Sequence, residues 1–153
     1  MIDFYKGNLS DINHFLKVYA YARTLGELEN LDGRTQETLE IAAIVHDIAC
    51  PLCREKYGNT DGKHQEAESE ALLRDFLAEF ELEPEVLERV IHLVCRHHTY
   101  EGIDGSDWQL LLEADYLVNA DEMKLSKDAI TTFRDKVFKS PVGINLINTI
   151  YQL

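Results

Sequence analysis

Apolar residues recur along most of the chain at spacings of three and four, which is the period of one face of an α-helix. This pattern predicts helices over about residues 10–28, 35–49, 62–80, 84–98 and 126–138, one that begins near residue 107, and a short last one over 144–153. No segment alternates apolar and polar residues as a half-buried strand does. We therefore predict an all-α fold in which residues 1–153 form one domain, a bundle of about six to eight helices.

Breaks in the pattern divide the chain further. Residues 1–9 are expected to be a short lead-in, and Ser10 or Asp11 to cap the first helix. Pro51 is expected to end the second helix, because proline cannot continue helical hydrogen bonding. Residues 50–62 would then be a loop or broken helix at the rim of a substrate site. Pro141 and Gly143 should break the chain within the C-terminal helices, residues 123–153.

The run Ile41–Ala49 is almost entirely apolar but contains adjacent His46 and Asp47. It is too long and too rich in alanine to favour a strand, so we interpret it as a buried helix. A buried ionised carboxylate is costly unless something pairs with it. A metal ion is one such partner, and imidazole is its commonest protein ligand. A salt-bridged aspartate beside a hydrogen-bonded core histidine is the simpler interpretation of this pair alone.

The rest of the chain favours metal, because more polar residues fall on or at the ends of predicted buried faces. The full set contains five of the six histidines: His14, His46, Asp47, His64, His97, His98 and Asp115. These ligands offer nitrogen and oxygen without sulfur, which suits Fe, Mn, Co, Ni or Zn in a catalytic role. Five imidazoles and two carboxylates are enough for one or two divalent ions. The residues 10–122 that hold them are the predicted ligand-bearing core.

The order His14, His46-Asp47, Asp115 resembles the HD superfamily of metal-dependent phosphohydrolases. The surrounding sequences His14-Phe-Leu-Lys-Val-Tyr-Ala, Ala42-Ala-Ile-Val-His-Asp-Ile and Glu113-Ala-Asp-Tyr-Leu-Val are similar as well. The resemblance spans about residues 10–120. It implies an all-helical fold, one metal ion held by those four residues, and hydrolysis of a phosphorylated, nucleotide-like small molecule.

The extra His64, His97 and His98 resemble the additional ligands of two-metal branches of that superfamily. One branch comprises the HD-type diadenosine tetraphosphate hydrolases, and another the cyclic dinucleotide phosphodiesterases called HD-GYP. The segment from His97 to Gly105 resembles the double-histidine segment of the second branch but lacks its Gly-Tyr-Pro. Small size and the His-His-Thr sequence therefore point to the small nucleotide hydrolases. Ala49-Cys50 stands where many members have Gly-Lys or Ala-Lys after the His-Asp pair.

Catalytic roles follow from this resemblance as expectations. Asp47 could bridge two ions, and Asp115 could orient or deprotonate the attacking water. Arg96 and Lys63 are neighbours of proposed ligands in the sequence and are favoured as cationic groups over Arg54 and Lys56. A histidine that binds no metal could protonate the leaving group. Gln65 and Glu66 are expected to be hydrogen-bond partners near the site.

The formal net charge of −13 argues against nucleic-acid polymers and anionic membranes as partners, since those require a basic face. The N-terminus shows no signal-peptide pattern and no apolar run approaches transmembrane length. Three cysteines are too few for a disulfide framework. We therefore expect a cytoplasmic protein with reduced thiols, in which Cys50 and Cys53 are ordinary residues. The two C-terminal helices are a candidate surface for a homodimer.

Three other functions remain open at this point. A single-metal nucleoside 5′-monophosphatase would follow if His64, His97 and His98 bind no metal. A non-catalytic regulatory module could bind metal and nucleotide without turnover, although the full ligand set argues against it. Some relatives of the resembled superfamily use two irons for oxygen chemistry, but this chain is small and has no clear insertions.

Overall fold

The computed structural model describes residues 1–153 and confirms an all-α fold. It contains nine helices and no strands, and α1 is a single turn of four residues. The helices are α1 (Ile2–Tyr5), α2 (Leu9–Leu28), α3 (Gly33–Val45), α4 (Cys50–Tyr57), α5 (Gly62–Leu77), α6 (Pro84–Val94), α7 (Ser106–Glu122), α8 (Lys127–Val137) and α9 (Pro141–Tyr151). None of them combines the length and the apolar composition needed to cross a membrane.

Three predictions about element ends were wrong, and the role of proline explains two of them. Proline lacks an N–H, but the first turn of a helix needs none there, so proline is as much a start signal as a stop signal. Pro51 and Pro141 lie in the first turns of α4 and α9. The segment after Pro51 is therefore helical, and α3 ends earlier, at Val45. The cap of α2 is Asn8, whose side chain accepts a hydrogen bond from the backbone N of Asp11.

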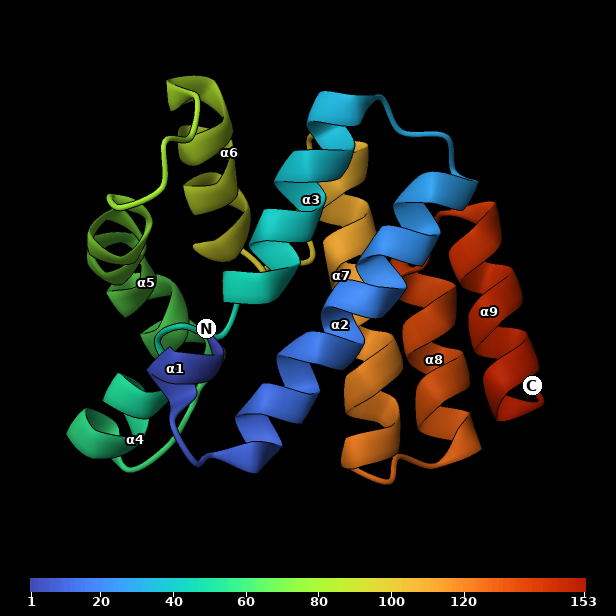
Figure 1. Cartoon of the computed structure of the whole chain (residues 1–153). Coiled ribbons are helices and arrows are strands. Elements are labelled where there is room, and N and C mark those ends of the chain that lie inside the picture. Colours follow the sequence, from blue (N-terminus) through green and yellow to red (C-terminus); the bar gives the residue numbers. More distant parts are fainter.

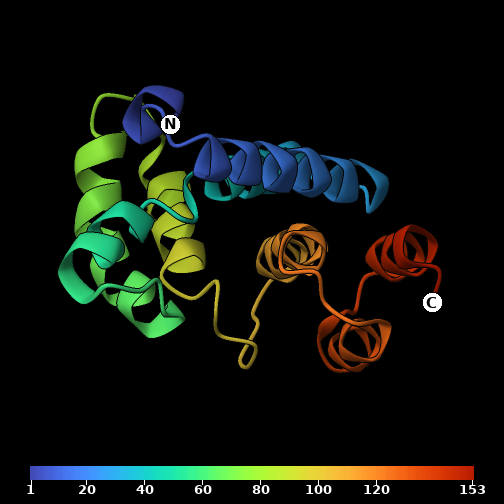
Figure 2. The same cartoon turned by 90° about the horizontal axis from the view of Figure 1, so that it is seen from below.

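The longest helix, α2, lies against both α3 and α7, and these three helices form the centre of the molecule. Figure 1 shows α2 running across the molecule, with α4, α5 and α6 on one side of this centre and α8 and α9 on the other. The view from below in Figure 2 shows the same separation. Helix α9 contacts α7 and α8, and Phe133 of α8 stacks on Tyr116 of α7. On the other side, α5 contacts α4 and α6.

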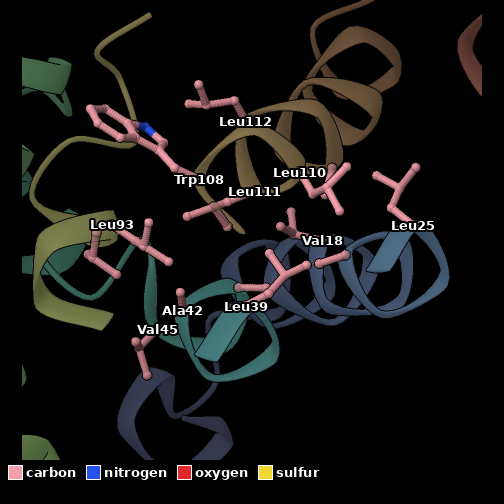
Figure 3. Packing of buried hydrophobic residues seen from close by; sticks show 14 of the residues in the cluster. Val18, Leu25, Leu39, Ala42, Val45, Leu93, Trp108, Leu110, Leu111 and Leu112 are labelled. Atoms are coloured by element: carbon pink, nitrogen blue, oxygen red, sulfur yellow. The ribbon is translucent and has the colours of Figure 1, made fainter. Parts of the chain in front are cut away.

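The core is a cluster of 26 buried residues that joins these helices. In Figure 3 side chains of α2, α3 and α7 meet at its centre, including Val18, Leu39 and Leu111. Ala22 of α2 and Ala42 of α3 are fully buried, and such small side chains allow their helices to approach closely. The core therefore fixes α2 and α7, which carry His14 and Asp115, relative to α3, whose C-terminal end is followed directly by His46.

Candidate metal centre

Three central helices bring His14, His46, Asp47 and Asp115 together. Nε2 of His14 lies 3.2 Å from Nε2 of His46 and 3.2 Å from Oδ1 of Asp115. Oδ2 of Asp47 lies 3.5 Å from Nε2 of each histidine, and Oδ1 of Asp115 lies 3.6 Å from Nε2 of His46. Neighbouring ligand atoms of an octahedral ion are about 3 Å apart when each lies about 2.1 Å from the ion. The spacing of the His14, His46 and Asp47 atoms therefore fits one divalent ion, and Oδ1 of Asp115 lies at a similar spacing from both histidines.

A second group of ligand atoms adjoins the first and shares Asp47 with it. Asp47, His97 and His98 each offer an atom within 4.8 Å of the others. Nε2 of His97 lies 3.6 Å from Oδ1 of Asp47, whereas Oδ2 of Asp47 faces His14 and His46. The two oxygens of one carboxylate therefore face different ligand groups.

The backbone holds two of the imidazoles in the tautomer that a metal ligand needs. Nδ1 of His46 lies 2.9 Å from the carbonyl oxygen of Ala43, and Nδ1 of His97 lies 2.7 Å from that of Val94. Since a carbonyl only accepts, Nδ1 carries a proton, and in the neutral ring Nε2 therefore keeps its lone pair. Nε2 of His97 is buried without a hydrogen-bond partner, and so is Nε2 of His98. Unpaired buried nitrogens are costly, and a bound cation would satisfy them. These donors fit a divalent metal.

Several supporting residues were not predicted from the sequence. Oε2 of Glu122 lies 2.8 Å from Nδ1 of His14, and Asn119 donates a 2.8 Å hydrogen bond to Oδ1 of Asp115. On α7, Asn119 lies four and Glu122 seven residues after Asp115, so helical spacing could have identified both. The Tyr5 hydroxyl donates a 2.8 Å hydrogen bond to the backbone carbonyl of Asp47. No sequence pattern links Tyr5, which lies on α1, to this position.

The charges of the centre are strongly coupled. Burial alone would raise the pKa of Asp47 and Asp115, but the neighbouring histidines hold both well below the usual range. Burial would lower the pKa of His14, yet the hydrogen bond to Asp115 and the charge of Asp47 raise it to about 9. In the absence of a cation the carboxylates thus favour the protonated forms of His14 and His46, whose pKa values are both raised. The centre requires positive charge, which a metal would supply.

His98 behaves differently from His14. Burial, together with the positive field of His97, lowers the pKa of His98 to about 4. Its imidazole is therefore neutral at neutral pH, which leaves its lone pair available to a ligand.

Five of the six ligand residues, all except the fully buried His46, line a cavity of about 590 Å³. Arg54 is the one lysine or arginine among its lining residues, and its Nη2 lies 2.6 and 2.7 Å from the two carboxylate oxygens of Asp11. Cys50 also lines the cavity, and burial raises the pKa of its thiol, so it remains protonated. Cys50, Cys53 and Cys95 form no disulfide.

Three predicted site residues lie outside this cavity. The ring of His64 stacks on Tyr57 with centroids 3.9 Å apart, and its Nδ1 lies 3.1 Å from Oδ1 of Asn59. Lys63 is exposed, and Arg96 is exposed with Nη1 3.2 Å from Nδ1 of His92. Adjacency in sequence favoured Lys63 and Arg96, but successive residues of a helical segment point in different directions. The cationic side chain that lines the cavity is that of Arg54, on α4.

Gln65 and Glu66, the two residues of α5 that follow His64, do point inward. Gln65 is buried and donates a 2.9 Å hydrogen bond to the carbonyl of Thr60. Oε1 of Glu66 accepts hydrogen bonds from the backbone N of His98 at 3.1 Å and from Oγ1 of Thr99 at 3.0 Å. Glu66 thus positions the segment that carries His98, in agreement with the expected role as a hydrogen-bond partner.

Comparison with known proteins bears on the family to which the whole chain belongs. A family model described as HD domain matches residues 11–134, which include all six residues of the two ligand groups. The chain belongs to the HD-domain family. HD domains bind divalent metals and are generally metal-dependent hydrolases. No curated protein and no solved structure matches the chain. The final helix α9 lies beyond the part that matches the HD domain.

Proposed function

We propose that this HD-domain protein is a metal-dependent phosphohydrolase that cleaves a phosphoester or phosphoanhydride bond of a nucleotide-like small molecule. One observation carries the proposal: the two carboxylate oxygens of Asp47 face two adjacent ligand groups in one cavity. Two adjacent ligand sets that share one carboxylate would suit two ions, which together would stabilise the attacking and leaving oxygens of a phosphoryl transfer.

The structure suggests which residues would hold each ion. His14, His46, Asp47 and Asp115 would hold the first, and Asp47, His97 and His98 the second. A bound divalent ion supplies positive charge for the phosphoryl oxygens and makes water acidic enough to attack near neutral pH. The nitrogen and oxygen donors suit Fe, Mn, Co, Ni or Zn.

The chain's own residues would align the reaction. Asp115 accepts a hydrogen bond from Asn119 at Oδ1, and this contact fixes the carboxylate that would orient the attacking water. Tyr5 holds the backbone of Asp47 through its hydroxyl. Such fixed positions lower the cost of aligning water with the leaving oxygen.

No free histidine is placed to protonate the leaving group. His14, His46, His97 and His98 belong to the ligand groups, while His64 and His92 do not line the cavity. This differs from the sequence-based expectation of a histidine general acid. We therefore assign the leaving-group proton to solvent water.

The test is the metal content of the purified protein, measured by elemental analysis for wild type, His14→Ala and His98→Ala. His64→Ala is the matched control, because His64 stacks on Tyr57 outside the cavity. We expect about two equivalents in wild type and His64→Ala, and fewer in each of the other two variants. Release of inorganic phosphate from nucleotides would then be measured with Mn, Co and Fe.

Other outcomes select other functions. About one equivalent, unchanged in His98→Ala, would replace the two-metal enzyme with a single-metal nucleoside 5′-monophosphatase. Absence of metal under every loading condition would contradict both enzymes and leave a binding module. Tight nucleotide binding without phosphate release by a fully loaded protein would also favour the module.

A further inference from the structure

The cavity around the ligand groups has two unlike ends. Arg54, on α4, and Phe133, on α8, both line it. In Figures 1 and 2 α4 and α8 lie on opposite sides of α7, which carries Asp115. One end of the cavity is therefore polar and charged, and the other is formed by α7, α8 and the segment that follows His98.

Three aromatic residues form the second end, which we call the aromatic wall: Tyr100, Tyr116 and Phe133. The rings of Tyr116 and Phe133 are parallel, with centroids 3.6 Å apart, and Tyr100 meets Phe133 edge-on at 5.2 Å. Buried Phe138 supports both Tyr116 and Phe133. The three side chains thus form one continuous aromatic surface.

The aromatic wall adjoins the ligands and is open to a ligand of its own. Tyr100 and Tyr116 line the same cavity as the ligands His98 and Asp115. Tyr100 remains 46% exposed although it lines the cavity. An exposed aromatic surface beside a few convergent polar groups is typical of a small-molecule site. Because aromatic faces stack on planar rings, this surface suits a ring held next to the ligand groups.

The charges of the cavity limit how many phosphates can accompany that ring. Besides the ligands Asp47 and Asp115, the lining contains three more carboxylates: Asp11, Asp61 and Glu122. The one cationic side chain, Arg54, is already paired with Asp11. Phosphates beyond the first would therefore lie near carboxylates with no free cation to offset them, which is unfavourable.

We propose that the aromatic wall makes the site selective for phosphate monoesters whose leaving group carries a planar ring, over ring-free esters and over polyphosphates. This inference rests on the proposed function and narrows its substrate class. Water would form the new P–O bond, the ester P–O bond would break, and the leaving oxygen would take a proton from water. The products are the ring-bearing alcohol and inorganic phosphate, with no change in oxidation state.

The test compares three substrates with the metal-loaded protein: adenosine 5′-monophosphate, ribose 5-phosphate and adenosine 5′-triphosphate. Tyr100→Ala removes the exposed part of the wall without touching the core. Tyr100→Phe keeps the ring, and Tyr57→Ala removes a tyrosine that does not line the cavity. We expect Tyr100→Ala to raise KM for the adenosine monophosphate about tenfold, which corresponds to about 1.4 kcal/mol. In Tyr100→Ala, KM for ribose 5-phosphate should not change. Tyr100→Phe and Tyr57→Ala should have the KM values of wild type.

Equal changes in KM for the two monophosphates would overturn the inference, and so would a higher kcat/KM for the triphosphate than for the monophosphate. Each of these results would leave phosphohydrolase activity itself intact. A separate measurement covers the case in which no substrate is cleaved. Saturation-transfer NMR with adenosine and metal-free protein should show binding to wild type and loss of binding in Tyr100→Ala. Absence of adenosine binding to wild type would contradict the ring-binding role of the wall.

Discussion

Oε2 of Glu122 lies 2.8 Å from Nδ1 of His14, and this contact joins the last turn of α7 to the first half of α2. The other oxygen of this carboxylate, Oε1, accepts a 2.9 Å hydrogen bond from Nζ of Lys17. A carboxylate on the far nitrogen of a ligand histidine fixes the ring and raises its basicity toward a metal. Glu122 therefore supports the centre without belonging to either ligand group.

Glu122→Gln tests this support. The amide keeps the size of the side chain but loses its charge, so His14 would be a weaker and less well oriented ligand. We expect metal affinity to fall about 10- to 100-fold, measured by competition with a chelator. Glu27→Gln is the control, because Glu27 lies on the same helix as His14 and pairs only with Arg23 at the surface. Equal affinities in wild type and Glu122→Gln would show that the contact does not serve the centre.

Gly62→Ala should disturb the second ligand group and spare the first. A Cβ at Gly62 would lie 2.6 Å from Cγ and 2.7 Å from Cβ of His98, and these atoms are too near the main chain to swing away. We expect elemental analysis to show one equivalent of metal fewer than in wild type. Gly33→Ala is a close match, since Gly33 also begins a helix and its Cβ would meet nothing within 4 Å. Full metal content in both variants would contradict a role for His98 as a ligand.

The stability of the metal-free protein should fall as pH rises from about 6.5 to about 9. The pKa of His14 is 6.5 in the unfolded chain and about 9 in the fold, since Asp115 and Asp47 outweigh the effect of burial. The folded state therefore binds this proton more tightly. The resulting stabilisation is complete below pH 6.5 and disappears as pH passes about 9. Urea unfolding of chelator-treated protein across this range measures the effect, and His14→Gln should flatten the profile. A urea midpoint that rises with pH over this range would contradict the raised pKa of His14.

A buried carboxylate outside the cavity should matter for stability alone. Glu113 is fully buried and accepts hydrogen bonds from the backbone N of Lys139 at 2.8 Å and of Ser140 at 3.0 Å. It also bonds the Ser140 hydroxyl, so it holds the chain where α9 begins. Glu113→Ala leaves these donors buried without a partner and should cost about 3 kcal/mol of unfolding free energy. Urea denaturation measures this cost, and exposed Glu37→Ala should change stability by less than about 0.5 kcal/mol. Comparable losses in the two variants would argue against the proposed anchor.

The sequence predicted the fold class and most helices because apolar periodicity records which faces are buried. His14, His46 and Asp115 lie on or beside those faces, and the structure places their ligand atoms within 3.6 Å of one another. The pattern does not tell whether a proline starts or stops a helix, which is why α4 was interpreted as a loop or broken helix.

The direction in which each side chain points within one helical turn was harder to predict. His64, Lys63 and Arg96 are neighbours of inward residues, but their own side chains lie outside the cavity. Arg54 enters the site because α4 is helical and its guanidinium reaches Asp11 at the start of α2. The outward directions of the three side chains and the approach of Arg54 to Asp11 both depend on how helices far apart in the sequence pack together. No local spacing reveals such contacts.

The positions of His46 and His97, each at or just beyond the C-terminal end of a helix, have a consequence for the order of events at the site. A helix carries partial negative charge at this end, because its last carbonyls have no partners within the helix. Both α3 and α6 direct that end toward the ligand groups, in addition to the carboxylates already there. An arriving phosphate would thus be repelled until a cation is in place. Binding should be ordered, with metal first, and phosphate should show measurable affinity for the loaded protein only.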